Sequence, residues 1–238
     1  MEARKVKIYH NQNYGVGRVN YKAVIFDLDG TLVNSRMAHV KSWREACENY
    51  GLEFNLMKFM SQVGKTSRDI AETLFNIEKE ELEKLISLKT RLFVRRYIDY
   101  VKIFPDVETT LKKLQKEGLK IGVASSNPRV VIRDVLDKLG ILKYVKEFVG
   151  DEDVNIGKPD PEILFKILKR LHVYPSEVVY VGDTAYDVLA GRKAGIRTVI
   201  LVSDKIPQGK ILEVYKPDYI ITEIKEIQDI ILRNRTIH

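Results

Sequence analysis

The chain has 238 residues, of which 45% are hydrophobic and 31% are charged, and this balance excludes a disordered protein and favours a soluble globular one. The single cysteine, Cys47, excludes an intrachain disulfide and a cysteine-rich zinc site, so we expect a reduced, cytoplasmic compartment. No apolar run reaches the roughly 18 residues that a membrane helix needs, so we expect no membrane partner.

The net charge of +7 is unevenly distributed along the chain. Residues 1–22 hold five basic side chains against one acidic side chain. Because the excess lies in a short segment, we do not expect the body of the protein to bind nucleic acid. We predict that residues 1–20 are an extension, in which 5–9 and 16–20 could form a small hairpin.

The first strong strand signal is the apolar run at residues 23–26, which suits a strand covered on both faces. Helical patterns then dominate up to Pro105, with helices predicted at 35–50, from Thr66 onward, and over 78–100. Thr66 and Asp69 have the spacing of a capping box, which marks the start of a helix.

Helices and strands alternate after Pro105. Helices are predicted at 107–117, 128–139, 161–172, 185–194 and from Glu223, and strands at 120–124, near 148–149, 178–182, 198–202 and 218–221. Such alternation predicts a parallel sheet with helices on both faces. The fold class is therefore a doubly wound α/β core, interrupted after its first strand by a helical insert of about 70 residues.

Small or ionisable side chains follow four of the predicted strands. They are Asp27 and Asp29 after 23–26, Ser125 and Ser126 after 120–124, Lys158 after the strand near 148–149, and Asp183 and Asp187 after 178–182. Because ligands bind beyond the carboxyl ends of parallel strands, we expect these side chains to meet at one edge of the sheet. Several carboxylates without His or Cys suit a hard cation, which predicts Mg²⁺.

This set of side chains predicts phosphoryl transfer. Asp27 can attack phosphorus as a covalent nucleophile. Asp29 can give a proton to the leaving oxygen and later take one from water. Lys158 and Mg²⁺ would stabilise the charge of the transferring group.

The segment Asp27-Leu28-Asp29-Gly30-Thr31-Leu32-Val33 resembles the first motif of the haloacid dehalogenase-like (HAD) phosphatases. Ser125, Lys158 in Gly-Lys-Pro-Asp-Pro, and Asp183 with Asp187 resemble the other three motifs, in the family's order. The insert resembles the C1 cap of the phosphoglycolate phosphatase and β-phosphoglucomutase branch. The resemblance implies a Rossmann-like core of five or more parallel strands at residues 21–34 and 105–238, with a cap at 35–104.

The resemblance also implies a role for each matched position. Asp27, Asp29 and Asp183 would be metal ligands, Asp29 through its backbone carbonyl. Ser125 and the amide of Ser126 would hold the phosphate, and Lys158 would pair with the phosphate and the nucleophile. Asp187 would orient the site. In the cap, the candidates for contact with substrate are His39, Lys65 and Arg68.

The function predicted in this way is a Mg²⁺-dependent phosphatase acting on a small phosphorylated metabolite, of the phosphoglycolate or sugar-phosphate class, as a monomer or homodimer. The nearest alternative is a phosphomutase of the β-phosphoglucomutase type, for which His39 is well placed. A pyrophosphatase is a further alternative. An inactive HAD-fold protein that binds nucleic acid or a partner through its basic N-terminus is the alternative from another class, and the complete set of acidic residues and Lys158 argues against it.

Overall fold

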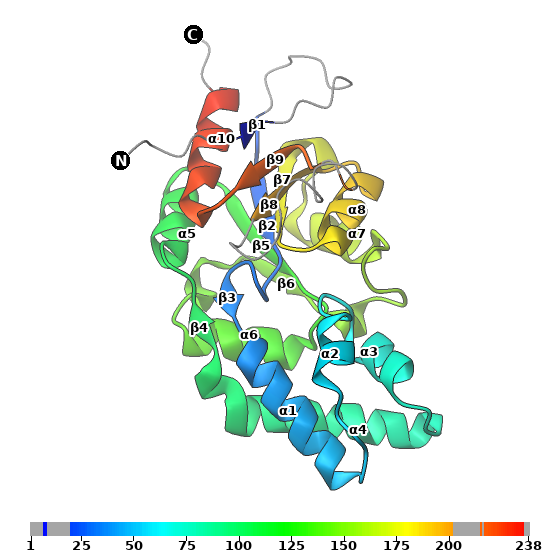
Figure 1. Ribbon diagram of the computed structural model, residues 1–238. Helices are drawn as coiled ribbons and strands as arrows, with labels where there is room; N and C mark the ends of the chain where they lie inside the picture. Colours follow the sequence, from blue (N-terminus) through cyan, green and yellow to red (C-terminus); the bar gives the residue numbers. More distant parts are fainter. Residues whose placement is uncertain (1–6, 9–19, 202–214, 216, 236–238) are drawn as a thin grey trace.

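A computed structural model describes residues 7–8, 20–201, 215 and 217–235. Its core is a seven-stranded sheet in the order β1-β9-β8-β7-β2-β5-β6 (Figure 1). The strands are β1 (Lys7–Ile8), β2 (Ala23–Phe26), β5 (Lys120–Ala124), β6 (Glu147–Val149), β7 (Val178–Gly182), β8 (Arg197–Leu201) and β9 (Tyr219–Ile221). Every pair is parallel except β1 with β9, which confirms the predicted α/β class.

Helices cover both faces of the sheet (Figure 1). One face packs against α5 (Val107–Lys116), α6 (Arg129–Lys138) and α10 (Ile227–Arg235), and the other packs against α7 (Glu162–Leu171) and α8 (Ala185–Lys193). Strand β2 shows why the first strand is a continuous apolar run. Val24 and Phe26 belong to one apolar cluster and Ala23 and Ile25 to the other, because successive side chains point to opposite faces.

A helical layer lies beyond the carboxyl ends of the strands, in the lower part of Figure 1. It consists of α1 (Arg36–Asn49), α2 (Leu56–Met60), α3 (Ser67–Leu74) and α4 (Lys79–Leu92), continued by the π-turn η1 (Phe93–Tyr97) and the 3-10 turn η2 (Ile98–Tyr100). Its apolar cluster, centred on Trp43, is separate from the two clusters of the sheet. We call this layer the cap, and its limits at residues 35 and 104 stay a prediction.

Several local predictions are confirmed, among them the capping box of Thr66 and Asp69 at the start of α3. Several features were not predicted, helix α2 among them, and two more concern how the chain enters and leaves the cap. The antiparallel pair β3 (Val33–Asn34) and β4 (Lys102–Ile103) lies where the chain passes between core and cap, and two-residue strands carry too little pattern to be recognised. The winding of the long helix predicted over 78–100 changes after α4.

At the N-terminus, β1 pairs with β9, so Lys7–Ile8 is not shown as half of a hairpin, and residues 16–19 lie outside the described part of the chain. Short 3-10 turns complete the core: η3 (Leu142–Tyr144), η4 (Asp151–Asp153), η5 (Pro175–Glu177) and η6 (Ile224–Glu226). Among the described residues, no helix combines the length and the apolar composition that crossing a membrane requires.

Candidate active site

The topology of the sheet brings the predicted residues together. Strands β5, β2 and β7 are neighbours and run in parallel, so their carboxyl ends lie side by side. Ser125 follows β5, Asp27 follows β2 and Asp183 follows β7. Residues about 150 positions apart in the sequence thus share one edge of the sheet.

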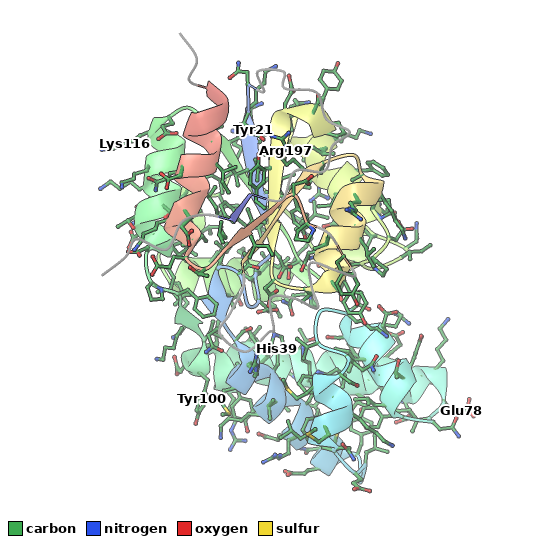
Figure 2. All side chains as sticks on the ribbon, turned by 45° about the horizontal axis from the view of Figure 1, so that its top comes forward. Tyr21, His39, Glu78, Tyr100, Lys116 and Arg197 are labelled. Atoms are coloured by element: carbon green, nitrogen blue, oxygen red, sulfur yellow. The ribbon has the colours of Figure 1, made fainter. Side chains whose placement is uncertain are left out.

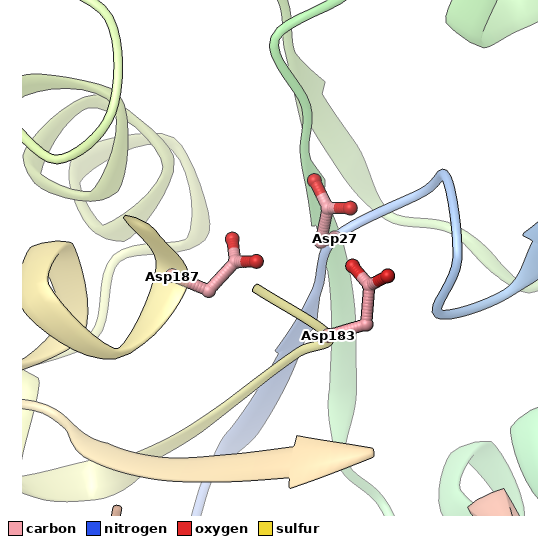
Figure 3. A group of neighbouring side chains, drawn as sticks. All are labelled: Asp27, Asp183 and Asp187. Carbon is pink, nitrogen blue, oxygen red and sulfur yellow. The ribbon is translucent and has the colours of Figure 1, made fainter. Parts of the chain in front are cut away.

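Three carboxylates from different segments point toward a common space (Figure 3). One oxygen from each of Asp27, Asp183 and Asp187 lies within 4.8 Å of the others. Oδ1 of Asp183 is buried and has no hydrogen-bond donor. Burial and the charges of Asp187 and Asp27 raise the pKa of Asp183 well above its ordinary value. A buried oxygen without a donor, in an all-oxygen set, fits a hard divalent cation such as Mg²⁺.

Gly30 makes room for the Asp183 carboxylate. A Cβ at position 30 would lie 1.9 Å from Oδ2 of Asp183, and the φ of Gly30 is +81°, a conformation that favours glycine. Both the close approach and the backbone conformation therefore require glycine in the Asp-Gly pair after β2.

Lys158 links two of the acidic residues. Its Nζ donates to Oδ1 of Asp27 at 2.6 Å and to Oδ1 of Asp187 at 2.8 Å. Asp187 is fixed further by the hydroxyls of Tyr180 at 2.5 Å and Thr184 at 2.6 Å. Burial acts to lower the pKa of Lys158, but Asp187 and Asp27 outweigh it and raise that pKa, so the ammonium stays charged. Burial raises the pKa of Asp27 to about 7, against the effect of Lys158.

Asp29 is held by three donors from two sides. Ser35 donates to Oδ1, Asn127 donates to Oδ2, and Nε2 of His39 lies 3.2 Å from Oδ2. Burial favours protonation of Asp29, but His39, Ser35 and Asn127 outweigh it and place its pKa below the ordinary range. Figure 2 shows His39 where α1 approaches the core. His39 was expected to contact substrate and Ser35 only to begin a helix, and no role was predicted for Asn127.

The two serines after β5 have different surroundings. Ser125 is buried, and its Oγ accepts from Nδ2 of Asn127 at 3.0 Å. The hydroxyl of Ser126 donates to the carbonyl oxygen of Gly64, in the cap, at 3.0 Å. The Ser126 side chain therefore contacts the cap, and its backbone amide is the group that stays predicted to hold phosphate.

A cavity of about 310 Å³ opens beside these residues, between core and cap. Asp29 and Asp183 line it from the core, and His39, Lys65 and Lys89 line it from the cap. Arg68 does not line it. The Arg68 guanidinium is half exposed and pairs with Glu83 on α4, so this geometry gives no support to a substrate contact by Arg68.

Lys89 is a site residue that was not predicted from the sequence. Only 1% of it is exposed, its Nζ donates to Oγ of Ser67 at 3.3 Å, and Nζ lies 5.6 Å from the ring centres of Trp43 and Phe93. Burial lowers the pKa of Lys89 to about 8. The sequence feature that could have indicated its burial is its position, because Lys89 lies four residues before Phe93 and four after Leu85 on the apolar stripe of the helix.

Comparison with known proteins agrees with this geometry. The family model described as haloacid dehalogenase-like hydrolase matches residues 24–201. Pyrophosphatase PpaX of Bacillus velezensis is 30% identical over 86% of this chain and 94% of its own length, and Pyrophosphatase PpaX of Oceanobacillus iheyensis is 27% identical over 90% and 98%. The crystal structure of β-phosphoglucomutase from Clostridium difficile shares the fold, with a TM-score of 0.77 and 22% identity, covering 90% of this chain and 97% of that one. This chain belongs to the haloacid dehalogenase-like hydrolase family.

Proposed function

We propose that this protein is a Mg²⁺-dependent phosphatase that cleaves a small, multiply charged phosphate compound through an aspartyl-phosphate intermediate. The observation that carries the proposal is one continuous site. The acidic cluster and Lys158 adjoin a cavity between core and cap whose cap side holds the buried ammonium of Lys89. The protein would act in the cytoplasm as a monomer or homodimer, without a nucleic-acid partner.

The reaction would proceed in two halves on Asp27. An oxygen of Asp27 forms a bond to phosphorus while the bond from phosphorus to the leaving oxygen breaks. Asp29 in its protonated form gives a proton to that oxygen, and in the second half regains one from the water that attacks the aspartyl phosphate. Lys158 donates to Asp27, which favours the ionised form of that carboxyl, and faces the transferring group, and Asp187 holds Lys158 in place.

Asp27, Asp183 and the backbone carbonyl of Asp29 would hold the magnesium ion. When bound, the ion supplies positive charge that stabilises the phosphoryl oxygens during transfer. Ser125 and the amide of Ser126 would hold the same group from the β5 side of the site.

The cavity supports a short leaving group that carries negative charge. Its volume is at the lower end of the roughly 300–1,000 Å³ that ligand pockets occupy. A fully buried ammonium needs an anion for compensation, and both Lys89 and Lys65 line the cavity. Pyrophosphate, whose leaving group is a second phosphate, is the first candidate, and the relatives named Pyrophosphatase PpaX support it. Phosphoglycolate and small sugar phosphates are the next candidates.

A phosphomutase is the second candidate function. His39 lines the cavity beside Asp29, where it could keep water from the acid/base in favour of a sugar hydroxyl. The fold similarity to β-phosphoglucomutase is compatible with either reaction.

The test is release of free phosphate from pyrophosphate, phosphoglycolate, glucose 1-phosphate and p-nitrophenyl phosphate, with Mg²⁺ and with EDTA. We expect magnesium-dependent release, fastest from a small anionic compound. Isomerisation of glucose 1-phosphate without release of phosphate would favour the mutase. No turnover of any compound would contradict both proposals.

A further inference from the structure

One turn of the cap lies against the core through one hydrogen bond and two close approaches at glycines. The turn comprises residues 64–66, between α2 and α3. The Gly64 carbonyl accepts from Ser126 Oγ at 3.0 Å, and a Cβ built on Gly64 would lie 3.2 Å from Cγ2 of Thr184. At the other end of the turn, a Cβ built on Gly157 would lie 2.7 Å from Cγ2 of Thr66.

Each core residue in these contacts is the immediate neighbour of a residue of the site. Ser126 follows Ser125, Thr184 follows Asp183, and Gly157 precedes Lys158. The cap turn therefore lies against the neighbours of three site residues, in the segments that follow β5, β6 and β7.

Gly157 is the position at which space matters most. It is not among the glycines with a positive φ, so its backbone conformation does not require glycine. A Cβ there would instead meet the methyl carbon of Thr66 at 2.7 Å and Oδ2 of Asp69 at 3.2 Å. Both obstacles belong to the cap, so the cap, and not the core, excludes a side chain at position 157.

We propose that the contact between Thr66 and Gly157 is the stop that sets how closely the cap sits over the cavity, and that Thr66 is a positioning residue for the reaction. The missing side chain of Gly157 lets the cap approach far enough for Lys89 and Lys65 to face the substrate. This inference deepens the proposed function, on which its activity test rests.

The test uses Gly157→Ala, Thr66→Ser and the double variant. Gly157→Ala should push the cap outward and lower kcat/KM for pyrophosphate on the order of 10- to 100-fold, because small displacements of reacting groups are costly. Thr66→Ser removes the obstructing methyl group and keeps the hydroxyl that accepts from the Asp69 amide at 3.1 Å. By itself Thr66→Ser loses one packing contact and should lower kcat/KM for pyrophosphate at most about threefold.

The double variant gives the decisive result. Thr66→Ser lowers activity slightly in the natural chain but should restore most of the activity of Gly157→Ala, within about fivefold of the natural protein. If Gly157→Ala acted only by distorting the Lys158 backbone, removing a methyl group from the cap would restore nothing. A double variant no better than Gly157→Ala overturns the proposal.

A second measurement is independent of the substrate. Trp43 is the only tryptophan of the chain, is fully buried and lines the cavity. Quenching of its fluorescence by acrylamide should increase in Gly157→Ala and return toward the natural value in the double variant. If the natural protein hydrolyses nothing, the proposed function fails and the quenching still tests the stop. An extent of quenching in Gly157→Ala equal to that of the natural protein contradicts the proposed stop between Thr66 and Gly157. So does failure of both the single Gly157→Ala variant and the double variant to fold, which would place the requirement for glycine within the core.

Discussion

Nζ of Lys158 lies 2.6 Å from Oδ1 of Asp27, and 2% and 10% of the two side chains are exposed. The pair brings a cation from the loop after β6 to the carboxylate that ends β2. In a site with three carboxylates, this ammonium favours the ionised form of Asp27 against burial, which raises the pKa of Asp27 to about 7. It therefore favours the form of Asp27 that attacks phosphorus, and replacing Lys158 would leave Asp27 and Asp187 without the cation that they share.

Replacement of Asp27 by Asn should abolish phosphate release, with a loss of at least about 10³-fold, because an amide cannot form the covalent intermediate. The side chain keeps its size, so we expect the circular dichroism spectrum to be unchanged. The measurement is phosphate release from pyrophosphate by a folded variant. Turnover at the natural rate would exclude Asp27 as the nucleophile.

Oδ1 of Asp183, which has no hydrogen-bond donor, predicts that Mg²⁺ changes the thermal stability of the protein. Mg²⁺ should raise the melting temperature of EDTA-treated protein, because it binds the folded carboxylate cluster and not the unfolded chain. Asp183→Asn should remove most of this increase and most of the magnesium-dependent activity. Thermal melts with and without Mg²⁺ provide the measurement. Asp160→Asn, outside the cluster, is the control, and an equal metal response in Asp183→Asn would contradict the assignment.

Lys89 should lower the free energy of unfolding of the protein while its charge supports the binding of an anionic substrate. Its pKa falls from the ordinary 10.5 to about 8, so the folded state disfavours the charged form. This cost is fully present below pH 8 and disappears as the pH rises to about 10.5, because the amine is then neutral in both states. Lys89→Met should therefore raise the free energy of unfolding by about 1–3 kcal/mol at pH 7.

Urea unfolding of Lys89→Met at pH 7 checks this prediction, and Lys84→Met, on an exposed part of the same helix, is the matched control. In the same variant, kcat/KM for pyrophosphate should fall. In the natural protein kcat/KM should decrease above pH 8 as Lys89 loses its charge, and this decrease should be absent from Lys89→Met. The charged or titratable groups near Lys89 are Asp29 and Asp151, which raise its pKa, and His39, whose own pKa it lowers. A variant with natural kcat/KM would exclude Lys89 from substrate binding.

The sequence predicts the sheet and the acidic edge because both depend on local patterns. The run 23–26 and the residues that follow each strand are visible without the structure, and parallel pairing brings them together. The cap side of the site was harder to predict. Lys89 and Arg68 are both cations on cap helices, and only packing shows that one is buried at the cavity and the other pairs with Glu83.

Ser35 and Asn127 show a second limit of the sequence. Ser35 was predicted only to begin a helix and Asn127 was given no role, and the contact of each with Asp29 becomes visible only in the folded structure. The pairing of 7–8 with β9 is of the same kind, because no local pattern specifies a partner more than 200 residues away.

The donors around Asp29 lead to the last prediction. Ser35→Ala removes the hydroxyl that donates to Oδ1 and leaves His39 and Asn127 on Oδ2. The carboxylate then loses its fixed orientation, so kcat for phosphate release should fall about tenfold while KM changes little, because Asp29 acts in proton transfer and not in binding. Ser35→Thr keeps the hydroxyl and should retain most of the activity, whereas Ser61→Ala, on an exposed cap serine, should change neither constant. Steady-state kinetics of the three variants decide the matter. A rise in KM at unchanged kcat in Ser35→Ala would mean that Ser35 contacts the substrate directly instead of orienting the acid/base.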